Sequence, residues 1–127
     1  MVQCMQIIRD KPADFTVVSG DDMLTMSQIA CGMRGVISVA GNFMAKDMSD
    51  MIHAALSSDF GEARRLHYKM MHGFELMFAE NNPAGVKAFM SAAGICGNNF
   101  RLPVVPVSDG LMHRIKDYLK TYEAGSK

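Results

Sequence analysis

Two short apolar runs, each followed by a glycine-containing polar turn and an amphipathic segment, constrain the fold of this chain most strongly. The first run is Phe15–Ser19, with its turn at 20–22, and the second is Gly35–Val39, with its turn at 40–42. Apolar and polar residues do not alternate in either run, which is typical of parallel strands covered on both faces. The sequence therefore predicts an α/β protein built from consecutive β/α units of a parallel sheet or barrel.

The rest of the chain is predicted to be helical. Asp59 and the Asn82-Pro83 pair are typical helix starts, and Gly94 is typical of a helix end. We expect residues 100–107 to be extended without being a central strand, because they contain two prolines. Helical periodicity predicts helices over residues 1–9, 23–31, 45–57, 59–80, 82–93 and 109–122. Two regions follow: β/α units over residues 1–58 and a three-helix extension over residues 59–127.

Two strands do not make a sheet. With 127 residues, of which 49% are hydrophobic, the chain is long enough to bury a core. A lone pair of parallel strands would nevertheless leave unpaired backbone groups along both outer edges. We therefore expect this chain to be one part of a larger parallel sheet or barrel, and to associate when it is isolated.

Charge and cysteine content exclude several classes of function. The 13 basic and 13 acidic residues cancel, and no run of like charge suggests a nucleic acid or an anionic membrane as partner. The sequence has neither a basic-then-apolar leader nor an apolar run of about 18 residues. Cys4, Cys31 and Cys96 are odd in number and widely spaced, which argues against a disulfide framework or a zinc site. These features predict a cytoplasmic protein.

The two turns hold the candidate site residues, and each has two interpretations. Asp21 and Asp22, after Gly20, could border a substrate pocket, but an acidic pair before a helix is also typical of a turn and a helix cap. Gly41 and Asn42 could offer backbone amides to a substrate carboxylate, or could form an ordinary turn. Both turns would lie on the same face of the sheet.

No metal site is predicted. The four histidines lie on predicted helices, and their spacing does not place a set of metal ligands on a shared face: His53, His67, His72 and His113. The three cysteines are interpreted as small core residues rather than nucleophiles.

Several segments together resemble a known family. The run 15–22, the run 35–39, Asn82-Pro83 with residues 86–88, and the segment 101–106 resemble the C-terminal part of dihydrodipicolinate synthases, as does the helix around Glu62-Ala63-Arg64. These enzymes belong to the N-acetylneuraminate lyase superfamily. The likeness runs in order over essentially the whole chain. It implies a (β/α)₈ TIM barrel, to which this chain would contribute the last two β/α units and a C-terminal three-helix extension.

The resemblance also implies a chemistry. Enzymes of this family are lyases that condense pyruvate with aspartate semialdehyde in diaminopimelate and lysine biosynthesis, through a Schiff base between pyruvate and a lysine. A tyrosine relays protons. Both residues would precede this chain, so no catalytic residue is expected here, and no metal or other cofactor is implied. The implied partners are pyruvate, an aldehyde and further copies of the protein.

Carried over position by position, the resemblance assigns roles to residues of this sequence. Ile37 matches a residue that contacts bound pyruvate. The turn of Gly20, Asp21 and Asp22 matches the border of the second-substrate pocket. Gly41 and Asn42 match the loop after the last strand. Met1, Val2 and Cys31 match positions in a subunit interface.

Two alternatives remain open, and the first of them shares this architecture. The chain could come from an N-acetylneuraminate lyase or a sugar-acid aldolase, because residues outside this sequence largely set substrate choice. It could also be a non-catalytic half-barrel that associates with itself.

Overall fold

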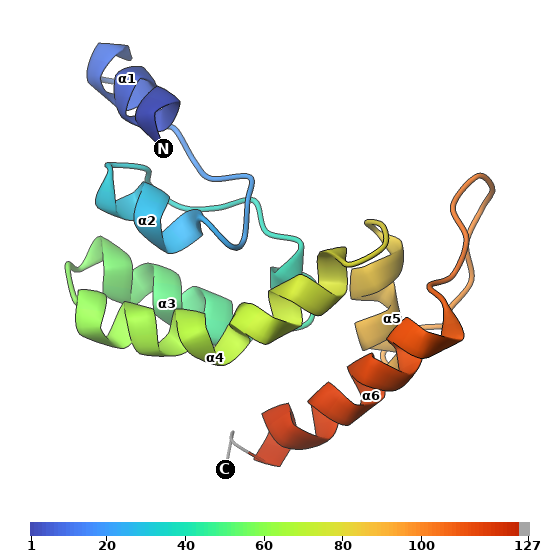
Figure 1. Ribbon diagram of the computed structural model, residues 1–127. Helices are drawn as coiled ribbons and strands as arrows, with labels where there is room; N and C mark the ends of the chain where they lie inside the picture. The colour runs from blue at the N-terminus through green and yellow to red at the C-terminus, as the bar shows by residue number, and fades with distance from the viewer. Residues whose placement is uncertain (125–127) are drawn as a thin grey trace. The chain divides into compact units, whose positions relative to one another are not determined.

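The computed structural model describes residues 1–124, and its regular elements are helices joined by extended segments (Figure 1). The last three residues of the predicted extension, 125–127, lie outside the described residues. The elements, in chain order, are α1 (Val2–Asp10), α2 (Thr25–Ala30), the 3₁₀ turn η1 (Ala40–Asn42), α3 (Ala45–Leu56), α4 (Phe60–Phe78), α5 (Ala84–Ala92) and α6 (Asp109–Ala124). None of the helices within residues 1–124 is both long enough and apolar enough to cross a membrane.

The two predicted strands do not form over their predicted lengths, so this prediction is wrong. Within residues 1–124 no β-strand forms, and a single parallel bridge joins Ser19 to Val36. Two backbone hydrogen bonds form this bridge, Ser19 N to Gly35 O (2.8 Å) and Ile37 N to Ser19 O (2.9 Å), and a third, Arg34 N to Val17 O (2.9 Å), joins the chain just before it. The predicted parallel direction is present, but each segment has only one neighbour, so the regular ladder stops after these bonds.

The helix boundaries follow local signals in the sequence. The Asp59 carboxylate accepts a hydrogen bond from the backbone N–H of Glu62 (3.1 Å), as expected for the cap of α4. Gly94, just after α5, has a positive φ of 75° that glycine adopts without strain. The start of α2 differs from the prediction: residues 22–24 form a turn, so the helix begins at Thr25 instead of residue 23.

Packing divides the chain into two compact units, with the division between Met71 and His72 inside α4. In the first unit α2 packs against α3. The core of this unit contains apolar side chains at helical spacing along α3 and α4, among them Met44, Met48, Met51, Ala63, Leu66 and Met70. Methionine side chains at helical spacing along α3 are therefore part of the core.

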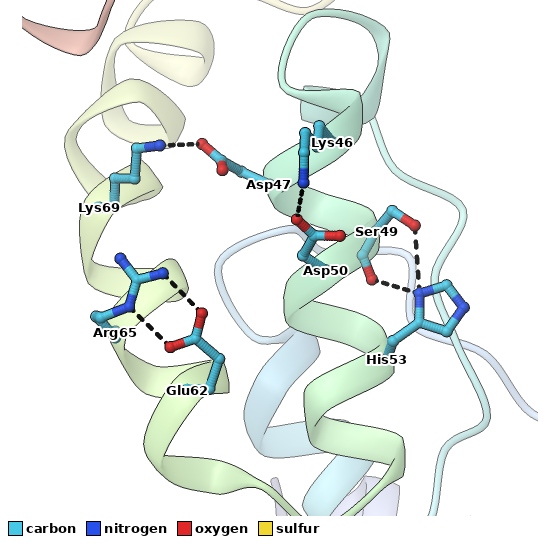
Figure 2. A network of polar contacts seen from close by, with 8 residues as sticks. All are labelled: Lys46, Asp47, Ser49, Asp50, His53, Glu62, Arg65 and Lys69. Carbon is cyan, nitrogen blue, oxygen red and sulfur yellow. Dashed lines mark hydrogen bonds and ion pairs between the residues drawn. The ribbon is translucent and has the colours of Figure 1, made fainter. Parts of the chain in front are cut away.

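An ion pair also joins α3 to α4 (Figure 2). Lys69 Nζ of α4 lies 2.8 Å from Asp47 Oδ2 of α3, and the two side chains are only 25% and 14% exposed. The other two ion pairs in Figure 2 are exposed, and each lies within a single helix. Lys46 pairs with Asp50 in α3, and Arg65 pairs with Glu62 in α4. Lys69 and Asp47 are thus the ion pair in this view that connects two elements.

We expect Lys69→Met to lower the free energy of unfolding by about 1–2 kcal/mol, because it removes the ion pair between the half-buried Asp47 carboxylate of α3 and the ammonium group of α4. The control is Lys46→Met, which removes an exposed pair in the first turn of α3 and should change stability by less than about 0.5 kcal/mol. Urea denaturation followed by circular dichroism measures both. Equal effects would contradict a structural role for the connecting pair.

In the second unit α5 packs against α6. Its buried side chains include Met77, Phe89, Val107, Leu111, Ile115 and Leu119. Ser108 joins the end of α4 to the start of α6, because its N–H and hydroxyl donate to the Glu80 carboxylate (2.9 and 2.5 Å). These two hydrogen bonds lower the pKa of Glu80. The Ser108 hydroxyl oxygen in turn accepts from the N–H of Leu111 (3.2 Å) and so caps α6.

Candidate functional site

Ser19 organises the first turn. Its backbone makes two of the three bonds to the second segment, and its buried hydroxyl accepts a hydrogen bond from Asp21 N (3.0 Å). Thr25 Oγ1, at the start of α2, donates to the Asp21 carbonyl oxygen (2.7 Å) and lies 3.2 Å from Ser19 Oγ. These contacts fix the path of the chain from the first segment into α2.

The two aspartates of this turn lie in different environments. Asp21 is exposed, and its Oδ1 accepts a hydrogen bond from Leu24 N (3.1 Å), so it caps the turn that leads into α2. Asp22 is 2% exposed, and its carboxylate reaches the second turn, where it accepts hydrogen bonds from Ser38 Oγ (2.5 Å), Val39 N (3.1 Å) and Ala40 N (2.8 Å). The structure thus brings the two predicted turns together, as expected, through Asp22.

In the second turn the amides already have partners. Gly41 N donates to Ser38 Oγ (2.7 Å), Asn42 N donates to Val39 O (3.1 Å), and the Asn42 side-chain amide donates to the same carbonyl (2.9 Å). Ile37, just before this turn, is 78% exposed. The site therefore presents an apolar side chain, an exposed carboxylate at Asp21 and the exposed backbone of Gly20.

No lysine in residues 1–124 follows directly on either extended segment, and the lysine nearest in sequence to the second turn is engaged elsewhere. Lys46, in the first turn of α3, pairs with Asp50 at 2.5 Å. The hydrogen bond and charge of Asp50 raise the pKa of the Lys46 ammonium, which keeps it protonated. A Schiff base requires a neutral amine, so Lys46 is poorly suited to form one.

The histidines are not gathered around the two turns. His67 is buried in the first unit, and this burial lowers the pKa of its imidazole. His53 and His72 are bonded within their own helices, to Ser49 and Glu75. Among the described residues, no group of three or more histidine, cysteine or acidic side chains is arranged to hold a metal ion.

Comparison with known proteins gives the family. Residues 1–122 match the sequence model of the dihydrodipicolinate synthetase family. The chain belongs to this family. A curated relative, the 4-hydroxy-tetrahydrodipicolinate synthase of Flavobacterium psychrophilum, is 42% identical over 120 residues, which are 94% of this chain and 41% of the relative.

Solved structures of the family superpose closely on this chain. Dihydrodipicolinate synthase from Aquifex aeolicus is 38% identical and superposes with a TM-score of 0.93 over 96% of this chain and 42% of its own. The chloride-inhibited enzyme from Acinetobacter baumannii, solved in complex with pyruvate, is 27% identical, with a TM-score of 0.91 over 96% of this chain and 42% of its own. This chain thus has the fold of part of a dihydrodipicolinate synthase and spans about two fifths of the length of its relatives.

Family membership leaves the roles of individual residues as predictions, and the structure gives their places. Met1 and Val2 are exposed at the start of α1, whereas Cys31 is half-buried at the end of α2. Sequence reasoning missed the hydroxyl groups of Ser19, Thr25 and Ser38, which make the hydrogen bonds within and between the turns. Hydroxyl residues beside a Gly-Asp-Asp turn could have indicated this network, because such side chains commonly bond to turn backbone.

The second unit has an open pocket of its own. Its lining residues are Pro83, Lys87, Asn99, Phe100, Arg101 and Val104. The Lys87 ammonium donates a hydrogen bond to the Asn99 carbonyl and lies 4.7 Å from the centre of the Phe100 ring. Lys87 therefore stabilises the loop after α5.

Proposed function

We propose that this chain is the C-terminal portion of a 4-hydroxy-tetrahydrodipicolinate synthase, a lyase that condenses pyruvate with aspartate semialdehyde in the cytoplasm. It supplies the last two β/α units of the TIM barrel and the three-helix extension. The likeness to dihydrodipicolinate synthases over nearly the whole chain carries this proposal. The parallel bridge between Ser19 and Val36 supports it, because neighbouring barrel strands pair in this direction.

In this proposal the chain binds and positions substrates, and the reacting groups lie in the remaining portion of the enzyme. That portion contributes the Schiff-base lysine and the proton-relay tyrosine. Ile37 gives bound pyruvate an apolar contact, and its exposed side chain is available for one. Gly20 and Asp21 border the pocket of the second substrate, and the turn of Gly41 and Asn42 closes the same side of the site.

The complete enzyme is proposed to be a homo-oligomer. Met1, Val2 and Cys31 contribute to its subunit interface. The exposed apolar side chains of Met1 and Val2 support this assignment, because such residues on a helix surface are well suited to a protein contact.

The proposal is tested by trapping the Schiff base. This chain, incubated with pyruvate and borohydride, should give no covalent adduct, because its lysines do not lie at the ends of the extended segments. A mixture with a polypeptide that spans the remaining N-terminal part of the Aquifex aeolicus enzyme should give a pyruvate adduct on that polypeptide. Intact-protein mass spectrometry measures both.

The control is the N-terminal polypeptide alone, which should react at least about tenfold more slowly, because the barrel around its lysine is incomplete. An adduct on any lysine of this chain would contradict the proposal. Equal labelling of the N-terminal polypeptide with and without this chain would contradict it too.

A further inference from the structure

We propose that Asp22 is a positioning residue that holds Ile37 in place for pyruvate, and that it does not bind substrate itself. This inference rests on the function proposed above and changes the expected role of one aspartate. It concerns the Asp22 brace, defined as the hydrogen bonds from Ser38, Val39 and Ala40 to the Asp22 carboxylate.

Burial and bonding argue against substrate binding by Asp22. Its side chain is 2% exposed, and both carboxylate oxygens accept hydrogen bonds from the second turn. A substrate group could reach an oxygen only by displacing one of these donors. Asp21 is exposed, and Leu24 N bonds to only one of its oxygens, Oδ1. Of the two neighbouring acids, Asp21 is therefore the one available to a ligand.

The brace connects the two halves of the site. Asp22 lies at the end of the first turn, and its three donors belong to consecutive residues just after Ile37. Ile37 itself donates its N–H to the Ser19 carbonyl oxygen (2.9 Å). The backbone at Ile37 is therefore fixed on one side by the parallel bridge and on the other by the brace. This double attachment allows an exposed side chain to keep a defined position.

The three donors favour a carboxylate over an amide at this position. Three donors converge on two oxygens, and one of these oxygens accepts from two successive backbone amides. An asparagine side chain has one acceptor oxygen and one NH₂ group, so its NH₂ would face either the Ser38 hydroxyl or the amides of Val39 and Ala40. If the NH₂ faces Ser38, the hydroxyl can accept from it and the two amides keep a neutral oxygen; if it faces the amides, their bonds are lost. In both cases Asp22→Asn changes few atoms and removes the charged acceptor of the brace.

The first experiment uses the chain alone and measures hydrogen exchange of its amides by NMR. In Asp22→Asn, the amides of Val39 and Ala40 should exchange at least about tenfold faster, because their charged acceptor is lost. The amide of Ile37, which bonds to the Ser19 carbonyl oxygen, should also exchange faster, because its segment is no longer held from both sides. The matched control is Asp59→Asn, in which asparagine serves equally well as a helix cap. Unchanged exchange of these three amides in Asp22→Asn would overturn the inference.

The second experiment uses the enzyme reconstituted with the N-terminal polypeptide. Asp22→Asn should raise the KM for pyruvate about tenfold and leave the KM for the aldehyde within about twofold, because Ile37 contacts only pyruvate. Asp59→Asn should change neither. A fall in kcat with both KM values unchanged would mean that less protein is folded, and would overturn the inference. If the reconstituted wild type forms no pyruvate adduct, the proposed function fails, and the exchange experiment still decides whether the brace holds Ile37.

Discussion

Gly85→Ala should lower the free energy of unfolding by about 3 kcal/mol. Gly85 lies in the first turn of α5, and a Cβ atom built on it would be 1.8 Å from the carbonyl oxygen of Met77. That oxygen is backbone near the end of α4, so it cannot move aside as a flexible side chain could. The glycine allows α5 to pack directly against the end of α4.

The control is Gly110→Ala in α6, in the same unit. The nearest atom to a Cβ at this position is Ser108 Oγ at 3.9 Å, which is ordinary van der Waals contact. Alanine has the higher helix propensity, so Gly110→Ala should raise stability by roughly 0.5 kcal/mol. Urea denaturation followed by circular dichroism gives both values. A Gly85→Ala variant as stable as the parent chain would mean that α5 can move away from α4 at little cost.

Local sequence signals were sufficient to predict most of the helices. The aspartate at 59 and the glycine at 94 mark boundaries in the structure, and apolar side chains at helical spacing are buried along α3. These signals depend on residues within one turn of each other, so they are complete within the chain. The last helix differs little, since α6 extends to Ala124 where the periodicity predicted an end at residue 122.

The strands were not predictable in the same way, because a strand is completed by its neighbours. The apolar runs correctly indicated two extended segments with parallel pairing, but the regular pairing stops at Ser19 and Val36. A run of β-branched residues gives a preference for extended backbone, and only a second partner provides the remaining hydrogen bonds.

The same distinction applies to the site. The sequence placed two carboxylates in one turn and gave them the same role, because periodicity and turn type cannot tell which of two successive side chains is buried. In the structure Asp21 faces solvent and Asp22 is 2% exposed. Ser38 bonds to Asp22 but not to Asp21, and it lies sixteen positions from Asp22 in the chain. Contacts of this range are set by the packing of the two segments, which the sequence alone does not specify.

The unpaired segments lead to the last prediction, that the isolated chain associates. Light scattering at tens of micromolar protein should give a mass of at least about two chains, because backbone groups at the outer edges of residues 15–19 and 35–39 lack strand partners within the described structure. Apolar side chains add to this tendency, since Phe15 is 60% exposed and Ile37 is 78% exposed. A monodisperse monomer would contradict the prediction.

Charged variants locate the contact. Phe15→Lys combined with Ile37→Lys should weaken association at least about tenfold, because lysines on exposed strand edges oppose pairing between chains. Leu102→Lys is the control: Leu102 is 86% exposed in the second unit and is not part of either extended segment. If Leu102→Lys dissociates the chain while the double variant does not, association occurs through the loop after α5. Loss of association only in the double variant would instead identify the surface that the remaining barrel strands are proposed to cover.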